Sequence, residues 1–481
     1  MSEDIREVDV VILGAGTAGL NAVREVRDCG RSWLLVDPGP YGTTCARVGC
    51  MPSKLLIAAA EAAHGARTAD LFGVRAEGVT VDSAAVMERL RRERDRFVGF
   101  VVEETESLPE ENRLLGCARF VGPTSLEVQT EEGSVRVETR ASVIATGSSP
   151  FVPDLLEPVR ERVLTSASLF ELETLPRSLA VIGTGVVGLE LGQALSRLGV
   201  EVAFFDRVAH PGPCTDPEVN RVIQRVLAER LVLHSEVELT DARMRDDAVE
   251  LVWKGADGVE SSARFEAVLA AAGRPPNLGL DLEKTGLALD DRGRPPWSPA
   301  TTQCGELPIF LAGDANGTRP LLHEAGDEGR IGGANAARWP EVESHDRRVT
   351  LHIVFSDPQI AMVGTPFDEL DRDAHCIGEV SFRNQGRARV MGLAEGLLRV
   401  YARRSDCVLV GAEMFGPRME HLAHLLAWAV QEGMRVQKLL AMPIYHPTFE
   451  EGMRTALRDL ARGLAIEGEC RSEDLTEAPG M

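Results

Sequence analysis

The chain has 481 residues, of which 44% are hydrophobic, so it is long enough for about three globular domains with ordinary packed cores. Its formal net charge of −22 argues against nucleic acid or an anionic membrane as the main partner, because both bind proteins through Lys and Arg. Neither a secretory signal at the acidic start nor a run of roughly 18 apolar residues is present in the sequence. We therefore expect a cytoplasmic protein.

The first predicted element is a strand over residues 8–13 that ends in a glycine-rich turn. The glycines of this turn are Gly14, Gly16 and Gly19. A helical pattern follows, and then a second apolar run over residues 33–36 that Asp37 closes. This succession is typical of a dinucleotide site. The glycines let the backbone approach a pyrophosphate, the helix N-terminus stabilises its charge, and the acid accepts hydrogen bonds from ribose hydroxyls.

Among the nine cysteines, only Cys45 and Cys50 lie close together. A regular helix separates such positions by about 7.5 Å along its axis, whereas a disulfide needs Cβ atoms about 4 Å apart. The two can therefore bridge only where the helix start is irregular, which Gly49 and Pro52 favour. So short a loop would add only about 2 kcal/mol of stability, so pairing in a reducing compartment indicates redox chemistry.

The next part of the chain predicts a long charged helix over residues 87–106, short strands, and a strand over residues 141–145 that ends in Thr146-Gly147. The glycine unit then recurs over residues 179–206. Its glycines are Gly183, Gly185 and Gly188, and its acid is Asp206. The first glycine and the acid are 23 residues apart in both units, which favours two dinucleotide sites over chance glycine loops.

The last third of the chain contains a candidate base. Dithiol exchange needs an attacking thiolate, a second sulfur that resolves the mixed disulfide, and a group that moves protons. Of the ten histidines, His446 is the best candidate, because it lies beside a proline turn and Glu451 can fix its tautomer. Taken alone, this pattern more often marks a buried or helix-capping histidine. The paired His421 and His424 are interpreted as a solvated helix face and not as a metal site.

Together these motifs resemble the pyridine nucleotide-disulfide oxidoreductases of the dihydrolipoamide dehydrogenase type, over roughly residues 8–465. Besides the two glycine units and residues 45–54, the matching segments are Ala145-Thr146-Gly147, Gly273-Arg274-Pro275-Pro276-Asn277, Gly313-Asp314 and His446-Pro447-Thr448. The resemblance implies an α/β fold with two Rossmann-like dinucleotide-binding domains and a C-terminal α+β dimerisation domain. The expected order is FAD-binding domain (first part) 1–153, NAD(P)-binding domain 154–272, FAD-binding domain (second part) 273–348, dimerisation domain 349–465 and a polar tail 466–481.

The resemblance also implies site residues. Cys45 matches the interchange thiol that attacks substrate, and Cys50 matches the thiol that lies against the flavin. Lys54 matches a lysine near the flavin, commonly paired with the glutamate that Glu190 matches. The full catalytic set is Cys45, Cys50, Lys54, Glu190, His446 and Glu451. The cofactor-binding set is Gly14, Gly16, Gly19, Asp37 and Asp314 for FAD, Gly183, Gly185, Gly188 and Asp206 for the nicotinamide dinucleotide, and in addition Thr146, Gly147, Arg274 and Gly313.

The function implied is that of a homodimeric dihydrolipoyl dehydrogenase, which oxidises dihydrolipoamide, free or on a carrier domain, with NAD⁺ through FAD and a redox-active disulfide. NAD is expected over NADP, because Asp206 would repel a 2′-phosphate, although Arg207 beside it is a contrary sign. Two alternatives are an NAD(P)H-dependent reductase of another low-molecular-weight disulfide and a flavin-bound sensor or scaffold without turnover. Departures from the family pattern at Thr17-Ala18, Gly42-Thr43-Thr44 and Glu450 leave the substrate open.

Overall fold

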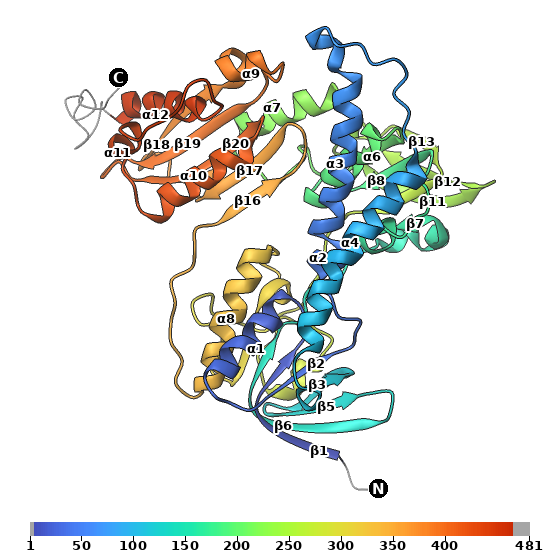
Figure 1. Cartoon of the computed structure of the whole chain (residues 1–481), viewed down its shortest axis with the longest axis vertical. Coiled ribbons are helices and arrows are strands. Elements are labelled where there is room, and N and C mark those ends of the chain that lie inside the picture. Colours follow the sequence, from blue (N-terminus) through green and yellow to red (C-terminus); the bar gives the residue numbers. More distant parts are fainter. Residues whose placement is uncertain (1–3, 465–481) are drawn as a thin grey trace. The chain divides into compact units, whose positions relative to one another are not determined.

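The computed structural model describes residues 4–464, and contacts divide the chain into two compact units (Figure 1). The first unit combines the chain up to Leu55 with residues 88–151 and 273–347, and the second combines residues 56–87 and 152–272 with the chain from Arg348. The expected fold class is confirmed, because each unit contains a parallel sheet with a glycine turn and the second also contains an antiparallel sheet. The expected domain boundaries stay predictions.

The first unit is built on a seven-stranded sheet of order β3-β2-β1-β6-β5-β4, with β15 beside β6. Its strands are β1 (Asp4–Leu13), β2 (Trp33–Asp37), β3 (Arg113–Leu115), β4 (Cys117–Gly122), β5 (Ser125–Gln129), β6 (Ser134–Ile144) and β15 (Ile309–Leu311). β1, β2, β6 and β15 run parallel, whereas β4 and β5 form an antiparallel extension. Because parallel strands end at the same edge, the segments that follow these four strands come together.

Two helices cover one face of this sheet, α1 (Thr17–Asp28) and α8 (Leu322–Arg338), which lie side by side in Figure 1. Their backbones touch, because a Cβ at Gly329 would lie 2.2 Å from the carbonyl oxygen of Ala18 and one at Gly333 would lie 2.7 Å from Cα of Ala22. Between helices and sheet lies a core of buried apolar side chains that includes Val10, Ile12, Val23, Val143 and Phe310. The glycines in α8 are therefore packing residues.

Several further elements belong to the first unit or connect the two. The helices are α2 (Thr44–Val48), α3 (Cys50–Arg67) and α4 (Ser83–Glu106), and α3 and α4 each contribute residues to both units. The short 3₁₀ turns of the first unit are η2 (Glu110–Asn112), η4 (Leu282–Thr285) and η5 (Gly313–Asn316), whereas η1 (Ala69–Phe72) belongs to the second unit. The helix expected over residues 87–106 is α4, which begins four residues earlier, at Ser83.

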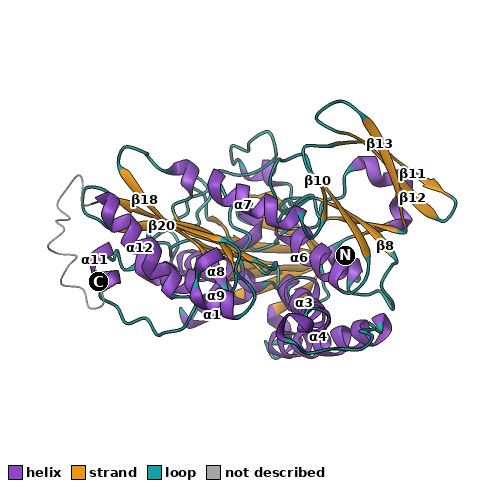
Figure 2. Cartoon of the chain, turned by 90° about the horizontal axis from the view of Figure 1, so that it is seen from above, coloured by secondary structure: helices purple, strands orange, loops and turns teal. Residues whose placement is uncertain are grey.

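The second unit begins with a parallel sheet of order β10-β9-β8-β14-β7. Its strands are β7 (Val163–Leu164), β8 (Ser178–Ile182), β9 (Glu201–Phe205), β10 (Val232–His234) and β14 (Ala267–Ala270). The associated helices are η3 (Asp154–Arg162), α5 (Ser166–Leu169), α6 (Val186–Arg197) and α7 (Pro217–Ala228). A separate antiparallel meander of β11 (Glu238–Arg245), β12 (Ala248–Lys254) and β13 (Glu260–Phe265) projects beside it in Figure 2.

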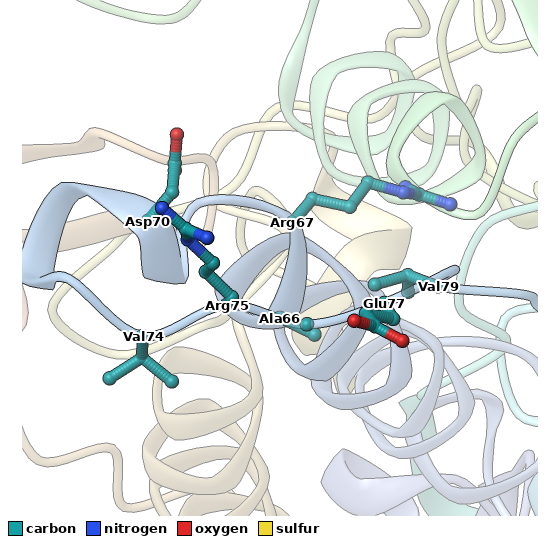
Figure 3. A pocket seen from close by; sticks show the side chains of 8 residues that line it. Ala66, Arg67, Asp70, Val74, Arg75, Glu77 and Val79 are labelled. Carbon is teal, nitrogen blue, oxygen red and sulfur yellow. The ribbon is translucent and has the colours of Figure 1, made fainter.

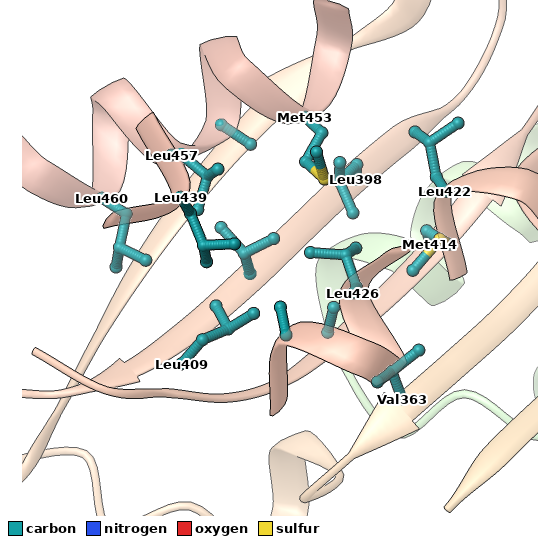
Figure 4. Packing of buried hydrophobic residues seen from close by; sticks show 14 of the residues in the cluster. Val363, Leu398, Leu409, Met414, Leu422, Leu426, Leu439, Met453, Leu457 and Leu460 are labelled. Atoms are coloured by element: carbon teal, nitrogen blue, oxygen red, sulfur yellow. The ribbon is translucent and has the colours of Figure 1, made fainter. Parts of the chain in front are cut away.

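An antiparallel sheet of order β16-β17-β20-β19-β18 completes the second unit. Its strands are β16 (Leu351–Val354), β17 (Gln359–Gly364), β18 (His375–Ser381), β19 (Leu397–Arg403) and β20 (Leu409–Gly416), and its helices are η6 (Phe367–Glu369), η7 (Phe382–Asn384), α9 (Gly386–Val390), α10 (Met419–Gln431), α11 (Val436–Leu440) and α12 (Glu451–Leu464). Figure 4 shows Leu398 and Met414 of the sheet packed against Leu422, Met453 and Leu457 of the helices. This dense core fixes where α12 begins.

Buried polar contacts join the two sheets of the second unit. The Asp216 carboxylate accepts hydrogen bonds from the Arg399 guanidinium at 2.7 and 2.8 Å and from the Tyr401 hydroxyl at 2.9 Å. Glu413 accepts the amide and the hydroxyl of Thr215 at 2.8 and 2.7 Å. Asp216 and Glu413 are both fully buried, and Asp216 also caps α7. Since buried carboxylates are costly unless they are paired, these contacts hold the start of α7 firmly against the antiparallel sheet.

Candidate functional site

The first glycine turn, after β1, has a backbone shape that only glycine permits. Gly14 has a φ of +109°, and a Cβ there would lie 2.4 Å from the carbonyl oxygen of Ala145. A Cβ at Gly19 would lie 1.8 Å from the carbonyl oxygen of Gly14. At Gly16, the N-cap of α1, an added Cβ would meet no heavy atom of residues 4–464 within 4 Å. The turn is therefore closed toward the protein and open at the helix start, as a pyrophosphate cradle requires.

The second turn, after β8, repeats the first closely. Gly183 has a φ of +105°, and a Cβ there would lie 2.5 Å from the carbonyl oxygen of Ala271. A Cβ at Gly188 would lie 2.0 Å from the carbonyl oxygen of Gly183, and Gly185 is the open N-cap of α6. The two units of the chain thus contain equivalent dinucleotide turns, which matches the equal spacing in the sequence.

The two strand-end acids bind their own glycine turns. Asp37 accepts the amide of Ala15 at 2.6 Å and that of Gly39 at 2.7 Å. Asp206 accepts the amide and the hydroxyl of Thr184 at 2.5 and 2.6 Å. Each acid therefore holds the residue that follows the first glycine of its turn. The ribose contact expected of each stays a prediction.

The carboxyl edge of the first sheet brings together several predicted cofactor residues. Thr146 follows β6, and its hydroxyl donates to the carbonyl of Asn277 at 2.7 Å. Ser148 donates to the Asp314 carboxylate at 2.7 Å and accepts from Arg274 Nε at 3.2 Å. Burial lowers the pKa of Arg274, and the negative charge of Asp314 opposes that shift. The sequence predicted Thr146, Arg274 and Asp314 as site residues, but it did not single out Ser148, which links Arg274 to Asp314.

Beneath this edge lies a buried acid that sequence reasoning missed. Glu328 is 1% exposed and accepts hydrogen bonds at 2.7 Å from the amide of Gly313 and from the side chain of Asn316. Burial raises the pKa of Glu328, and a hydrogen bond from Arg347 opposes the shift. Glu328 thus orients the Gly313–Asn316 turn that presents Asp314. A clue in the sequence was the presence of two acids, Glu324 and Glu328, one helical turn apart in an Ala- and Gly-rich helix.

The two neighbouring cysteines lie on either side of a helix break. α2 ends at Val48 and α3 begins at Cys50, with Gly49 between them at a non-helical φ of −127° and ψ of −116°. A Cβ at Gly49 would lie 3.0 Å from the carbonyl oxygen of Thr44. This close approach lets residues five apart come into contact, as the sequence predicted.

In this structure Cys45 and Cys50 are both in the thiol form, the first partly buried and the second exposed. A hydrogen bond with the Cys50 sulfur, followed by burial, raises the pKa of Cys45. A thiol so shifted keeps its proton. Cys45 therefore needs a base before it can act as a nucleophile.

The predicted base and its acid meet at the start of α12. Nδ1 of His446 lies 2.9 Å from Oε1 of Glu451, and the His446 side chain is 80% exposed. The hydrogen bond from His446 is the main cause that lowers the pKa of Glu451. An ionised Glu451 fixes the tautomer with the proton on Nδ1, which leaves Nε2 to accept a proton from a thiol.

Lys54 and Glu190, the other predicted catalytic pair, belong to different units, so their pairing stays a prediction. Glu190 is 4% exposed, and its Oε1 accepts the amide of Phe355 at 3.0 Å. Cys45 and His446 likewise belong to different units. The structure therefore shows the Cys45–Cys50 pair within the first unit and the His446–Glu451 dyad within the second.

A surface cavity of about 490 Å³ lies where α3 ends (Figure 3). Its lining residues are Ala66, Arg67, Asp70, Val74, Arg75, Ala76, Glu77 and Val79, none of them a predicted site residue. Over residues 4–464, no group of three or more His, Cys, Asp or Glu side chains is placed to hold a metal ion. In the same range, every helix is too short or too polar to cross a membrane.

Known proteins match nearly the whole chain. The model of the pyridine nucleotide-disulphide oxidoreductase family matches residues 8–329, and that of its dimerisation domain matches residues 350–457. A dihydrolipoyl dehydrogenase from Haloferax volcanii is 30% identical over 95% of this chain and 97% of its own length. Dihydrolipoyl dehydrogenase 3 from Pseudomonas aeruginosa is 31% identical over 94% of this chain and 97% of its own.

Solved structures agree on the fold. LpdA from Mycobacterium tuberculosis has a TM-score of 0.80 at 25% identity and covers 94% of this chain and 99% of its own. The HOCl-induced flavoprotein disulfide reductase RclA from Escherichia coli has a TM-score of 0.79 at 21% identity, which shows the fold alone, over 95% of this chain and 99% of its own. With its two glycine turns, its neighbouring thiols and family matches over both regions, the chain belongs to the pyridine nucleotide-disulphide oxidoreductases and is an FAD-dependent enzyme.

Proposed function

We propose that the protein is a dihydrolipoyl dehydrogenase, which oxidises dihydrolipoamide to lipoamide with NAD⁺ in the cytoplasm. The observation that carries this proposal is the contact between Cys45 and Cys50 across the break at Gly49, since a redox-active pair is what a dithiol substrate exchanges with. The relatives that match this chain over nearly its full length and carry the name dihydrolipoyl dehydrogenase support the substrate.

The cofactor residues fit two dinucleotides. The open turn at Gly16, with Asp37 and Asp314, would hold FAD, and the equivalent turn at Gly185, with Asp206, would hold the nicotinamide dinucleotide. Bound there, FAD would supply the two-electron link between the enzyme dithiol and the nicotinamide. The thiol exchange and the proton transfers would be carried out by side chains of this protein.

Thiol exchange would proceed in two displacements. His446 takes the proton of one substrate thiol, and the resulting thiolate attacks Cys45 of the Cys45–Cys50 disulfide, so that Cys50 leaves as a thiolate. His446 releases the first proton to solvent and then takes the proton of the second substrate thiol, whose thiolate attacks the substrate sulfur bonded to Cys45 and closes the lipoamide ring. Cys45 leaves with the electron pair and takes up a proton from His446. The substrate is oxidised by two electrons and the enzyme disulfide is reduced by two.

A second candidate function is the reduction of a different small disulfide by NADH. Tyr445, directly before the proposed base, is 83% exposed, and Glu450 follows in the same loop. A large exposed aromatic ring beside the base offers a contact surface that a flat or apolar disulfide would use. A flavin-bound sensor without turnover is the third candidate. The chain has both the Cys45–Cys50 pair and the His446–Glu451 dyad, which a protein without turnover would not need, and this argues against the sensor.

The decisive measurement is a steady-state assay of the FAD-loaded protein with a panel of dithiols and disulfides. Dihydrolipoamide with NAD⁺ should give a kcat/KM at least about tenfold above that of any other dithiol or disulfide, which corresponds to about 1.4 kcal/mol of transition-state discrimination. A higher kcat/KM for another disulfide with NADH would establish the second candidate. A flavin that NADH bleaches but no disulfide reoxidises would establish the sensor.

The two cysteines should not be interchangeable. Cys45→Ser should lower dithiol turnover by at least about 10³-fold and keep the long-wavelength thiolate-to-flavin absorbance of the reduced protein, because the family resemblance places Cys50 against the flavin. Cys50→Ser should lose the absorbance as well. Absorption spectra recorded during anaerobic reduction distinguish the two variants, and a long-wavelength band that persists in Cys50→Ser would reverse the assigned roles.

The protein should prefer NADH to NADPH, because the Asp206 carboxylate at the end of β9 would repel a 2′-phosphate. Asp206→Asn keeps an oxygen that can accept the hydrogen bonds of Thr184 but removes the charge. It should therefore reduce the NADH-to-NADPH ratio of kcat/KM by about tenfold or more without unfolding the turn. The preference is wrong if wild-type protein has the higher kcat/KM with NADPH.

We also expect a homodimer whose site is shared, because His446 lies in the region matched by the dimerisation-domain model, about 400 residues after Cys45. Cys45→Ala and His446→Ala should each be inactive alone. After reversible dissociation and mixing at equal concentration, about half the dimers are mixed and each has one intact site, so activity should recover to roughly a quarter of wild type. If subunit exchange is verified by mass and the mixture stays inactive, each site is contained within one subunit.

A further inference from the structure

The segment before α9 contains a buried side chain that contacts the loop of the proposed base. Gln385 is the N-cap of α9 and is 9% exposed. Its Oε1 accepts the amide of Ala388 at 2.7 Å, and its Nε2 donates to the carbonyl of Thr448 at 2.6 Å. Because one partner is a donor and the other an acceptor, the network fixes which end of the side-chain amide faces which partner.

Thr448 lies at the centre of the hydrogen bonds that shape the loop. Its amide donates to Oε2 of Glu451 at 3.2 Å, and its hydroxyl donates to the carbonyl of Tyr445 at 2.9 Å. Oε1 of the same Glu451 lies 2.9 Å from Nδ1 of His446. The position of the Thr448 backbone therefore determines where both oxygens of Glu451 point, and through them the orientation of the imidazole.

The loop itself has little packing to hold it. Tyr445, His446 and Pro447 are all exposed, and an exposed segment with few apolar contacts depends on hydrogen bonds for its order. Gln385, by contrast, lies in a well-packed part of the second unit. Phe382, one turn before it, is fully buried, and a Cβ at Gly452 would lie 3.0 Å from Cζ of Phe382. The bond from Gln385 to Thr448 thus fastens an exposed loop to a rigid part of the sheet domain.

We propose that Gln385 is a positioning residue for the His446–Glu451 dyad, an inference that rests on the proposed function. The side chain acts through Thr448 and touches neither substrate nor cofactor. Without its amide hydrogen bond, the loop samples conformations in which Glu451 no longer accepts the Nδ1 proton, and proton transfer from the substrate thiol slows. Removing such a supporting contact at a metal site typically costs 10–100-fold in activity or affinity, so a loss on the order of 10-fold or more is expected in kcat.

The experiment compares three variants of the FAD-loaded protein. Gln385→Ala removes both hydrogen bonds. Gln385→Glu keeps the oxygen that caps α9 but places a second oxygen opposite the Thr448 carbonyl. Ser381→Ala is the matched control, because Ser381 caps the neighbouring turn η7 through the amide of Arg383 at 3.4 Å and, within residues 4–464, makes no side-chain hydrogen bond to the loop. Gln385→Ala and Gln385→Glu should each lower the kcat with dihydrolipoamide about 10-fold or more. The KM for NAD⁺ and the rate at which ferricyanide oxidises NADH should stay unchanged in both variants. Ser381→Ala should leave all three quantities unchanged.

Two further readouts separate positioning from general loss of structure. The carboxyl group introduced by Gln385→Glu can donate to the Thr448 carbonyl when it is protonated, so the activity of this variant relative to wild type should rise as the pH falls, while that of Gln385→Ala should not. The hydrogen bond from His446 lowers the pKa of Glu451 in the wild-type protein. In Gln385→Ala the pKa of Glu451 should therefore move up toward its ordinary value, which carboxyl ¹³C NMR measures without any turnover.

Failure of this inference and failure of the proposed function give different results. If His446→Ala keeps full dithiol turnover, the proposed base is wrong, and the Glu451 titration alone still tests whether Gln385 holds the dyad. If His446→Ala is inactive but Gln385→Ala has wild-type kcat and an unchanged pKa of Glu451, the positioning role is overturned. Should Gln385→Ala fail to fold, the nearly isosteric Gln385→Glu provides the same comparison through its pH profile.

Discussion

The close approach of a glycine turn to the next parallel strand is the constraint on which both cofactor sites depend. At Gly14 and Gly183 the backbone lies so near the carbonyl oxygens of Ala145 and Ala271 that any side chain would collide with them. This approach brings the N-terminus of a helix to the carboxyl edge of its sheet, where its free amides can meet a phosphate. A larger residue at Gly14 or Gly183 would move the helix start, and with it the place where the pyrophosphate binds.

Buried or partly buried carboxylates hold the turns of the first unit in place. In the first unit, Asp37 orients the turn from the next strand, and Glu328 orients the Gly313–Asn316 turn from α8. These carboxylates accept backbone amides, so a negative charge is balanced by peptide dipoles near the place where a phosphate would bind. Asp37 and Glu328 thus set the geometry of the turns whose amides they accept.

The second unit contains the proposed base, His446, whose side chain is largely exposed and needs support from its neighbours. The buried contacts of Asp216 and Glu413 join the start of α7 to the antiparallel sheet, and an apolar core lies under α12. His446 lies just before that helix and is largely exposed, so its order comes from Glu451 and from the Thr448 loop. Hydrogen bonds, and not apolar packing, therefore control the orientation of the His446 imidazole.

The sequence predicted the two glycine turns and the neighbouring thiols, and its family resemblance led to the choice of His446 with Glu451. Each of these is a local pattern whose spacing carries physical meaning, such as a glycine where no Cβ fits or an acid five residues after a histidine. Tertiary structure alone decided the partners that lie far apart along the chain. Ser148 with Asp314, Glu328 with Gly313, and Gln385 with Thr448 are separated by 166, 15 and 63 residues, and no local periodicity links them. Such contacts form only because sheet order and helix packing bring distant segments together, and a single sequence contains no direct record of that arrangement.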